Sequence, residues 1–175
     1  MSPHAPPIRI LKRPGQPRRG LILAPGLALP CALGRGGVRR AKREGDGATP
    51  AGLSRVIRGF YRADRLRRPR TALPLRPIRA GDGWCDDPAH RCYNRLVQRP
   101  FAGGHERLWR DDAVYDIVLE LDWNRRPIRR GRGSAIFLHI ARPGFTSTDG
   151  CVAISLAGMR RLLPRLRPGV SFVIG

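Results

Sequence analysis

The apolar runs of this chain are short, and turns that contain glycine or proline separate them. Runs of about four to eight residues are typical of strands, whereas a helix needs about ten or more. Only the segment after Ser155 has apolar residues at helical spacing, at Leu156, Met159, Leu162 and Leu163. No internal repeat is present. The pattern therefore predicts a mostly β domain, a closed or sandwiched sheet with one short helix.

The individual elements follow from turn and cap residues. Residues 21–24 and 27–33 flank Pro25-Gly26 and predict a hairpin. Ser155 is a good N-cap, and Pro164 ends the helix that we expect over residues 156–163. The Arg- and Pro-rich residues 62–78 are expected to form an irregular surface segment. Further strands are predicted over residues 53–61, 114–121, 135–138 and 170–174. Residues 105–109 could form a short helix, although the helix after Ser155 is the one clear helix.

The length of 175 residues fits one domain with a proper core, and 41% of the residues are hydrophobic. We expect a flexible tail over residues 1–7 and a single domain over residues 8–175. The net charge of +21 comes from 34 Lys and Arg against 13 Asp and Glu. These basic residues are spread over nearly every segment, whereas a nucleic-acid-binding protein usually gathers them on one face. No specific nucleic-acid partner is therefore expected, and a basic nucleic-acid-binding protein remains an alternative of a different class.

The four cysteines, at positions 31, 85, 92 and 151, form no Cys-x-x-Cys pair. Cys85, His90 and Cys92 offer three metal ligands without a fourth and without the usual zinc spacing, so no metal site is predicted. Reduced thiols are the expected state, and a Cys85–Cys92 disulfide would need an oxidising compartment. Two prolines and a glycine interrupt the apolar residues 21–33, so we predict neither a signal peptide nor a membrane span.

Residues 134–153 carry the chemistry. The apolar residues 135–138 predict a buried strand that ends at His139, and a turn at Pro143-Gly144 leads to Cys151 and a second short apolar run. A histidine that closes one strand and a cysteine that opens the next can meet in space. Such a pair suits nucleophilic catalysis, in which the imidazole activates the thiol and a third group orients the imidazole. A buried structural cysteine beside a hydrogen-bonded histidine would show the same spacing.

The order of these residues resembles the signature of the YkuD-type L,D-transpeptidase family. That signature has a His, a variable turn and then Ser/Thr-x-Gly-Cys, which His139 and Thr148-Asp149-Gly150-Cys151 match. The segment 42–52, with Thr49-Pro50-Ala51-Gly52, resembles the Gly-rich segment of the same family. The resemblance covers most of residues 8–175 and agrees with the mostly β fold.

Three positions depart from the usual family pattern of His-Gly and Ser-His-Gly-Cys-x-Arg. Ile140 follows His139, Asp149 replaces the second histidine, and Ala153 stands where the family usually has Arg. The family Arg is expected to help hold substrate or shape the oxyanion site. We therefore predict that another cation, Arg142, takes that role, since Arg binds carboxylates through paired hydrogen bonds.

The resemblance implies a cysteine L,D-transpeptidase that acts on peptidoglycan stem peptides through a thioester acyl-enzyme and forms crosslinks. Cys151 would be the nucleophile and His139 the base and then the acid. Thr148 would orient the imidazole, and the amides of Gly150 and Cys151 would stabilise the oxyanion. No cofactor is needed, and covalent inhibition by a carbapenem is expected. An L,D-carboxypeptidase that uses water as acceptor is the nearest alternative, and a catalytically idle wall-binding module is another.

Six further residues are candidate substrate contacts. A Gly/Pro loop that carries Trp, Tyr and Asn offers a flat apolar surface and directed hydrogen bonds. The same composition would arise if the aromatic rings of that loop were packed into the core. The Gly-rich residues 34–52 are expected to form a rim near the active site. The candidates are Trp84, Tyr93, Asn94, Tyr115, Arg142 and Asp149.

The expected location rests on the resemblance alone. Family resemblance implies the cell envelope or periplasm, whereas the lack of a recognisable signal peptide leaves the cytoplasm as a second option. The sequence predicts no oligomeric state.

Overall fold

The computed structural model describes residues 6–175. The first five residues of the predicted tail lie outside the described residues, and the first strand begins at Ile8. No helix in the described part of the chain is long and apolar enough to cross a lipid bilayer.

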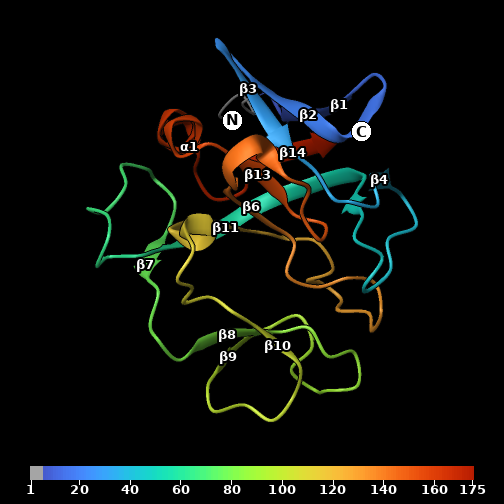
Figure 1. Ribbon diagram of the computed structural model, residues 1–175, viewed down its shortest axis with the longest axis vertical. Helices are drawn as coiled ribbons and strands as arrows, with labels where there is room; N and C mark the ends of the chain where they lie inside the picture. Colours follow the sequence, from blue (N-terminus) through green and yellow to red (C-terminus); the bar gives the residue numbers. More distant parts are fainter. Residues whose placement is uncertain (1–5) are drawn as a thin grey trace, which may run out of the picture.

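A nine-stranded sheet forms most of the domain (Figure 1). Its order is β11-β12-β13-β3-β2-β1-β14-β6-β7, and it closes on itself because the long strand β6 also pairs with β11. Closure leaves few free strand edges, which would otherwise be able to pair with other chains. The strands are β1 (Ile8–Arg13), β2 (Gln16–Ala24), β3 (Leu27–Ala32), β6 (Gly52–Tyr61), β7 (Leu75–Pro77), β11 (Ile117–Leu121), β12 (Phe137–Ile140), β13 (Val152–Ile154) and β14 (Ser171–Ile174).

Smaller elements complete the fold. A three-stranded sheet of β8, β9 and β10 lies beyond the large sheet in the lower part of Figure 1, and β4 pairs with β5. Within residues 6–175, one α-helix packs on the large sheet, and three short 3-10 helices lie in the connections. These elements are β4 (Val38–Arg39), β5 (Thr49–Pro50), β8 (Asp82–Cys85), β9 (Leu96–Gln98), β10 (His105–Arg107), α1 (Leu156–Leu162), η1 (Ala113–Tyr115), η2 (Pro143–Phe145) and η3 (Leu163–Arg165).

The predicted fold class, a mostly β closed sheet with one short helix, is confirmed. The predicted hairpin is β2–β3, where Ala24 pairs with Leu27. The Ser155 side chain accepts a hydrogen bond from the Gly158 amide at 3.0 Å, as an N-cap does.

Three local predictions were wrong. The buried strand expected over residues 135–138 covers Phe137–Ile140 instead, so His139 lies inside the strand and not at its end. Residues 105–107 form a strand and not a helix, because Glu106 pairs with Trp84 of β8 in an antiparallel ladder. The strand expected over residues 114–121 begins only at Ile117. The Asp112 side chain caps the Val114 amide and starts a 3-10 turn in front of it.

Two groups of buried side chains lie on opposite faces of β11, β12 and β13. Side chains alternate along a strand, so Leu138 and Ile140 point away from Phe137 and His139. The aliphatic core contains Leu138, Ile140, Val152 and Ile154 together with residues of α1. The aromatic core consists of Phe60, Ile78, Trp84, Leu108, Val114, Tyr115, Val118, Ala135, Phe137 and Cys151.

Candidate active site

The parallel pairing of β12 and β13 places His139 and Cys151 on the same face of two adjacent strands. Leu138 pairs with Val152 and His139 with Ala153, so Cys151 comes directly before the first paired residue of β13. The Cys151 thiol donates to the Ala135 carbonyl at 3.1 Å, and the Phe137 amide donates to the Cys151 sulfur at 3.4 Å. The thiol is therefore held against the start of β12, on the face that carries Phe137 and His139.

His139 is buried, and its Nδ1 lies 2.9 Å from the Ile140 carbonyl oxygen. Because a carbonyl only accepts hydrogen bonds, the neutral ring carries its proton on Nδ1 and its basic lone pair on Nε2. The ring of Tyr115 packs edge-on against the imidazole, with the centroids 5.3 Å apart. These two contacts fix the tautomer and the orientation of the imidazole.

Thr148 shapes the turn in front of Cys151 and has a different role from the one predicted. Its hydroxyl donates to the Cys151 carbonyl at 2.6 Å and accepts from the Gly150 amide at 3.2 Å. The Thr148 carbonyl accepts from the Arg35 amide. The carbonyl that orients the His139 imidazole is that of Ile140 and not that of Thr148. Because Ile140 is the next residue in the chain, the sequence could have suggested this contact.

Gly150 is required by the backbone. Its φ of +127° disfavours any side chain, and a Cβ there would lie 2.9 Å from the Ala48 carbonyl oxygen. Because its amide is bonded to Thr148, it is not a free oxyanion donor. Among residues 6–175 the amide of Cys151 has no such partner, so it is the donor that remains for a developing oxyanion.

The Gly-rich segment 34–52 packs beside this turn. The Thr49 hydroxyl donates to the Cys151 carbonyl at 3.3 Å and accepts from the Gly34 amide at 2.8 Å. Lys42 is buried and contacts Asp46 at 2.6 Å, and its charge lowers the pKa of Cys151 against the dominant effect of burial. The segment thus touches the Cys151 turn, in the region where a rim was expected.

Burial keeps the side chains of Cys151 and His139 neutral. Burial raises the pKa of the Cys151 thiol well above its ordinary value, and the Glu106 carboxylate raises it further. Burial lowers the pKa of His139 to about 4. At neutral pH the two side chains are therefore a thiol and a neutral imidazole, and a reaction at this thiol would need the imidazole as a general base rather than as half of a preformed ion pair.

Trp84, Tyr93 and Asn94 lie almost completely inside the protein, with exposed fractions of 1–2%. The Asn94 side-chain oxygen accepts from the Trp84 indole at 3.0 Å and from the Ala135 amide at 3.1 Å. The Trp84 ring packs edge-on against Phe137, and the Tyr93 hydroxyl donates to Glu44. These side chains support the segment that holds the thiol, which is the core-packing alternative left open by the sequence.

Tyr115, Arg142 and Asp149 surround the pair in different ways. Tyr115 is buried, and its hydroxyl donates to Glu106 at 2.5 Å. The exposed Asp149 pairs with Arg35 at 2.7 Å. Arg142 is half exposed and contacts Asp112 at 3.4 Å.

The sequence did not predict a chain of ion-paired side chains beside the aromatic core. Arg110 lies 4.0 Å from Glu106 and 2.8 Å from Asp112, which in turn contacts Arg142. Burial raises the pKa of Glu106. Assigning residues 105–109 to a helix hid Glu106, because only the strand pairing turns its carboxylate towards Tyr115.

The remaining cysteines and polar clusters lie outside this site. Cys31, Cys85 and Cys92 are free thiols. Within residues 6–175 no group of three or more His, Cys, Asp or Glu side chains is placed to hold a metal. Ala153 stands where the family pattern has Arg. It is buried and pairs with His139 of β12 on one side and with Ala32 of β3 on the other.

A closed β domain with a thiol and a neutral imidazole on one face of two parallel strands is suited to cysteine-dependent acyl transfer. The chain matches the model of the YkuD family, described as the L,D-transpeptidase catalytic domain, over residues 18–174. It therefore belongs to this family, whose members are cysteine-dependent enzymes that act on peptidoglycan. No curated protein and no solved structure matches the chain.

Proposed function

We propose that this protein is a cysteine L,D-transpeptidase of peptidoglycan stem peptides, with Cys151 as the nucleophile. One observation carries the proposal most directly. The Cys151 thiol and the His139 imidazole lie on the same face of adjacent strands, and both His139 ring orientation and thiol position are fixed by hydrogen bonds. Family membership supplies the substrate class.

The proposed reaction transfers one proton back and forth. Cys151 attacks the carbonyl of the donor stem as its proton passes to Nε2 of His139, and the Cys151 amide stabilises the oxyanion. The carbon–nitrogen bond then breaks, His139 protonates the departing amine of the terminal D-amino acid, and a thioester remains. An amine of a second stem attacks the thioester, loses its proton to His139 and regenerates the thiol, which forms the crosslink.

The carboxypeptidase alternative uses the same thioester and differs only in its acceptor. Water would attack the acyl-enzyme and release a shortened stem. The buried Ala153 supports this alternative, since the family Arg that is expected to help hold substrate is missing at this position.

The deciding experiment incubates the protein with purified disaccharide-tetrapeptide and measures the products by mass spectrometry. Crosslinked dimers would support the transpeptidase, and tripeptide monomers would support the carboxypeptidase. Cys151→Ala should give neither product, whereas the matched control Cys92→Ala, which removes a more exposed thiol, should behave as the parent. An unchanged tetrapeptide with the parent protein would contradict both activities.

The location proposed for this activity is the cell envelope, because that is where the stem peptides are. The proposal rests on the substrate class alone. Fractionation of cells that produce the full chain, with immunodetection of each fraction, tests it.

A further inference from the structure

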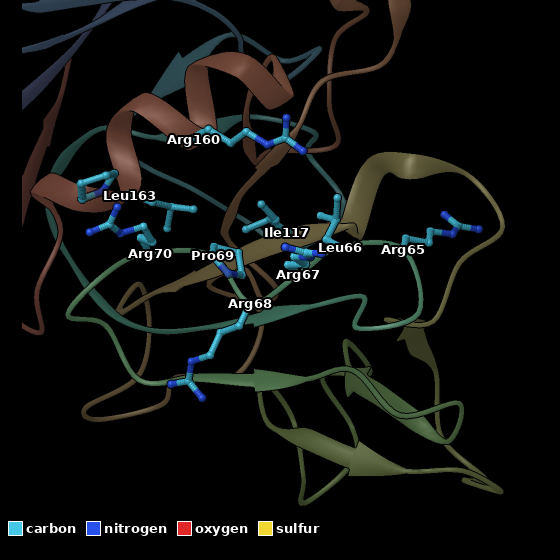
Figure 2. Close-up of a pocket in the computed structure, with 10 residues that line it drawn as sticks. Arg65, Leu66, Arg67, Arg68, Pro69, Arg70, Ile117, Arg160 and Leu163 are labelled. Atoms are coloured by element: carbon cyan, nitrogen blue, oxygen red, sulfur yellow. The ribbon is translucent and has the colours of Figure 1, made fainter.

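A cavity of about 430 Å³ lies between α1 and the loop that joins β6 to β7 (Figure 2). Its volume is within the range of about 300–1,000 Å³ that is common for small-ligand sites. The loop is held in place, because the Thr71 hydroxyl donates to the Leu166 carbonyl at 3.1 Å and the Leu66 amide to the Arg62 carbonyl at 2.9 Å. The lining residues of this arginine cavity are Arg65, Leu66, Arg67, Arg68, Pro69, Arg70, Ile117, Arg160, Leu163 and Pro164.

The charges that line the cavity have one sign. Half of the lining residues are arginines and none is acidic. Arg65 contacts Asp116 at 2.9 Å. The guanidinium groups of the other four have no ion pair or hydrogen bond within residues 6–175. Figure 2 shows Arg160 reaching from α1 over the side where Leu66 and Arg67 lie. Figure 2 shows Arg65 and Arg68 pointing away from Ile117 and Leu66, so Arg67, Arg70 and Arg160 are the cations that concern a bound ligand. Like charges close to one another repel, and an anion between them would relieve that repulsion.

The cavity is separate from the candidate active site. Its floor includes Ile117 and Leu163, which belong to the aliphatic core. Val118, the next residue along β11, belongs to the aromatic core together with Cys151 and pairs with His139. Because successive side chains of a strand point to opposite faces, the arginine cavity and the thiol lie on opposite faces of the sheet.

We propose that the arginine cavity binds a small anion with at least two phosphate groups. A guanidinium group matches phosphate through two parallel hydrogen bonds, and each phosphate brings about −1.5 to −2 charges and three acceptor oxygens. Several unpaired arginines therefore suit more than one phosphate group. The apolar floor of Leu66, Ile117 and Leu163 would contact the part of the ligand that carries the phosphates.

Binding of inorganic pyrophosphate, measured by calorimetry at about 0.15 M salt, tests the proposal, since this salt screens weak surface attraction. The parent is expected to bind one pyrophosphate per chain. Arg67→Ala with Arg160→Ala should weaken binding by at least about tenfold, through loss of charge-assisted hydrogen bonds. The control Arg9→Ala with Arg18→Ala removes the same charge from β1 and β2 and should change affinity by less than about twofold.

A second probe distinguishes a soluble ligand from a lipid headgroup. Vesicles of phosphatidylcholine that contain cardiolipin, whose headgroup carries two phosphates, replace pyrophosphate in a flotation assay with the same variants. Vesicle binding that only the cavity variant loses would assign the phosphate to a headgroup, and selective loss of pyrophosphate binding would assign it to a soluble anion. Equal losses in the two double variants, or no binding to either probe, would overturn the proposal. Labelling of Cys151 by a carbapenem in the same variants reports the proposed function separately and should not change.

Discussion

The two faces of strands β11, β12 and β13 share one backbone but carry different kinds of side chain. One face is aliphatic and packs against α1, with Leu138, Ile140 and Val152 almost fully buried. The other face carries Phe137, His139 and Cys151, with Tyr115 and Glu106 packed beside them. Apolar burial on the first face stabilises the strands, and this stability allows titratable groups to be buried on the second. Substitutions on the two faces should therefore separate stability from chemistry.

The largest effect is expected at Cys151. Incubation with a carbapenem should increase the intact mass of the parent by one acyl adduct, and Cys151→Ala should abolish that increase. The substitution removes one small atom, so its effect on the free energy of unfolding should be about 1 kcal/mol. Intact-mass spectrometry and urea denaturation measure the two quantities. An adduct on Cys85 or Cys92 would place the reactive thiol elsewhere.

The opposite result is expected one residue before His139, on the aliphatic face. Leu138 is fully buried, so Leu138→Ala should lower the free energy of unfolding by about 2–5 kcal/mol. Its rate of carbapenem labelling, measured well below the unfolding midpoint, should stay within about twofold of the parent because its side chain points away from the thiol. A labelling rate well below half that of the parent would show that the two faces are coupled.

The pH dependence of the free energy of unfolding should depend on His139 and not on the aliphatic face. Burial lowers the pKa of His139 to about 4, whereas an exposed histidine titrates near about 6.5. Between these values the unfolded chain binds a proton that the folded chain does not, so the free energy of unfolding falls as pH decreases through this window, by about 3 kcal/mol. Urea denaturation at about pH 7 and about pH 4.5 measures the loss.

His139→Gln is the matched variant for that titration. It keeps a polar planar side chain and cannot take up a proton, so its loss of stability between the two pH values should be smaller than that of the parent. Leu138→Ala should lose as much as the parent. Equal pH dependence in the parent and in His139→Gln would show that His139 does not titrate in this window.

The sequence predicted the local strand–turn–strand segment around the thiol better than the long-range pairings that surround it. A strand, a turn and a strand place His139 and Cys151 on one face through a local connection, and the Ser155 cap is equally local. The closure of the sheet depends on β6 pairing with both β14 and β11, which no local pattern encodes. The Asn94 side chain likewise accepts from the Ala135 amide, 41 residues further along the chain. The pairing of residues 105–107 with β8 outweighed their local preference.

The smallest effect is expected at Arg142, which the sequence analysis assigned to substrate binding. If Arg142 did hold a substrate carboxylate, losing that charge-assisted hydrogen bond would raise KM or lower kcat/KM by about tenfold or more. In the structure its guanidinium already contacts Asp112, and its side chain is 48% exposed. An exposed ion pair contributes about 0–1 kcal/mol, so Arg142→Ala should change kcat/KM for stem-peptide turnover by no more than about fivefold. Arg142→Lys is the control, because it keeps the charge and loses the paired geometry. A rise in KM of tenfold or more in Arg142→Ala, partly restored in Arg142→Lys, would show that Arg142 leaves Asp112 to bind a substrate carboxylate, and would extend the reactive face of the sheet to the turn after β12.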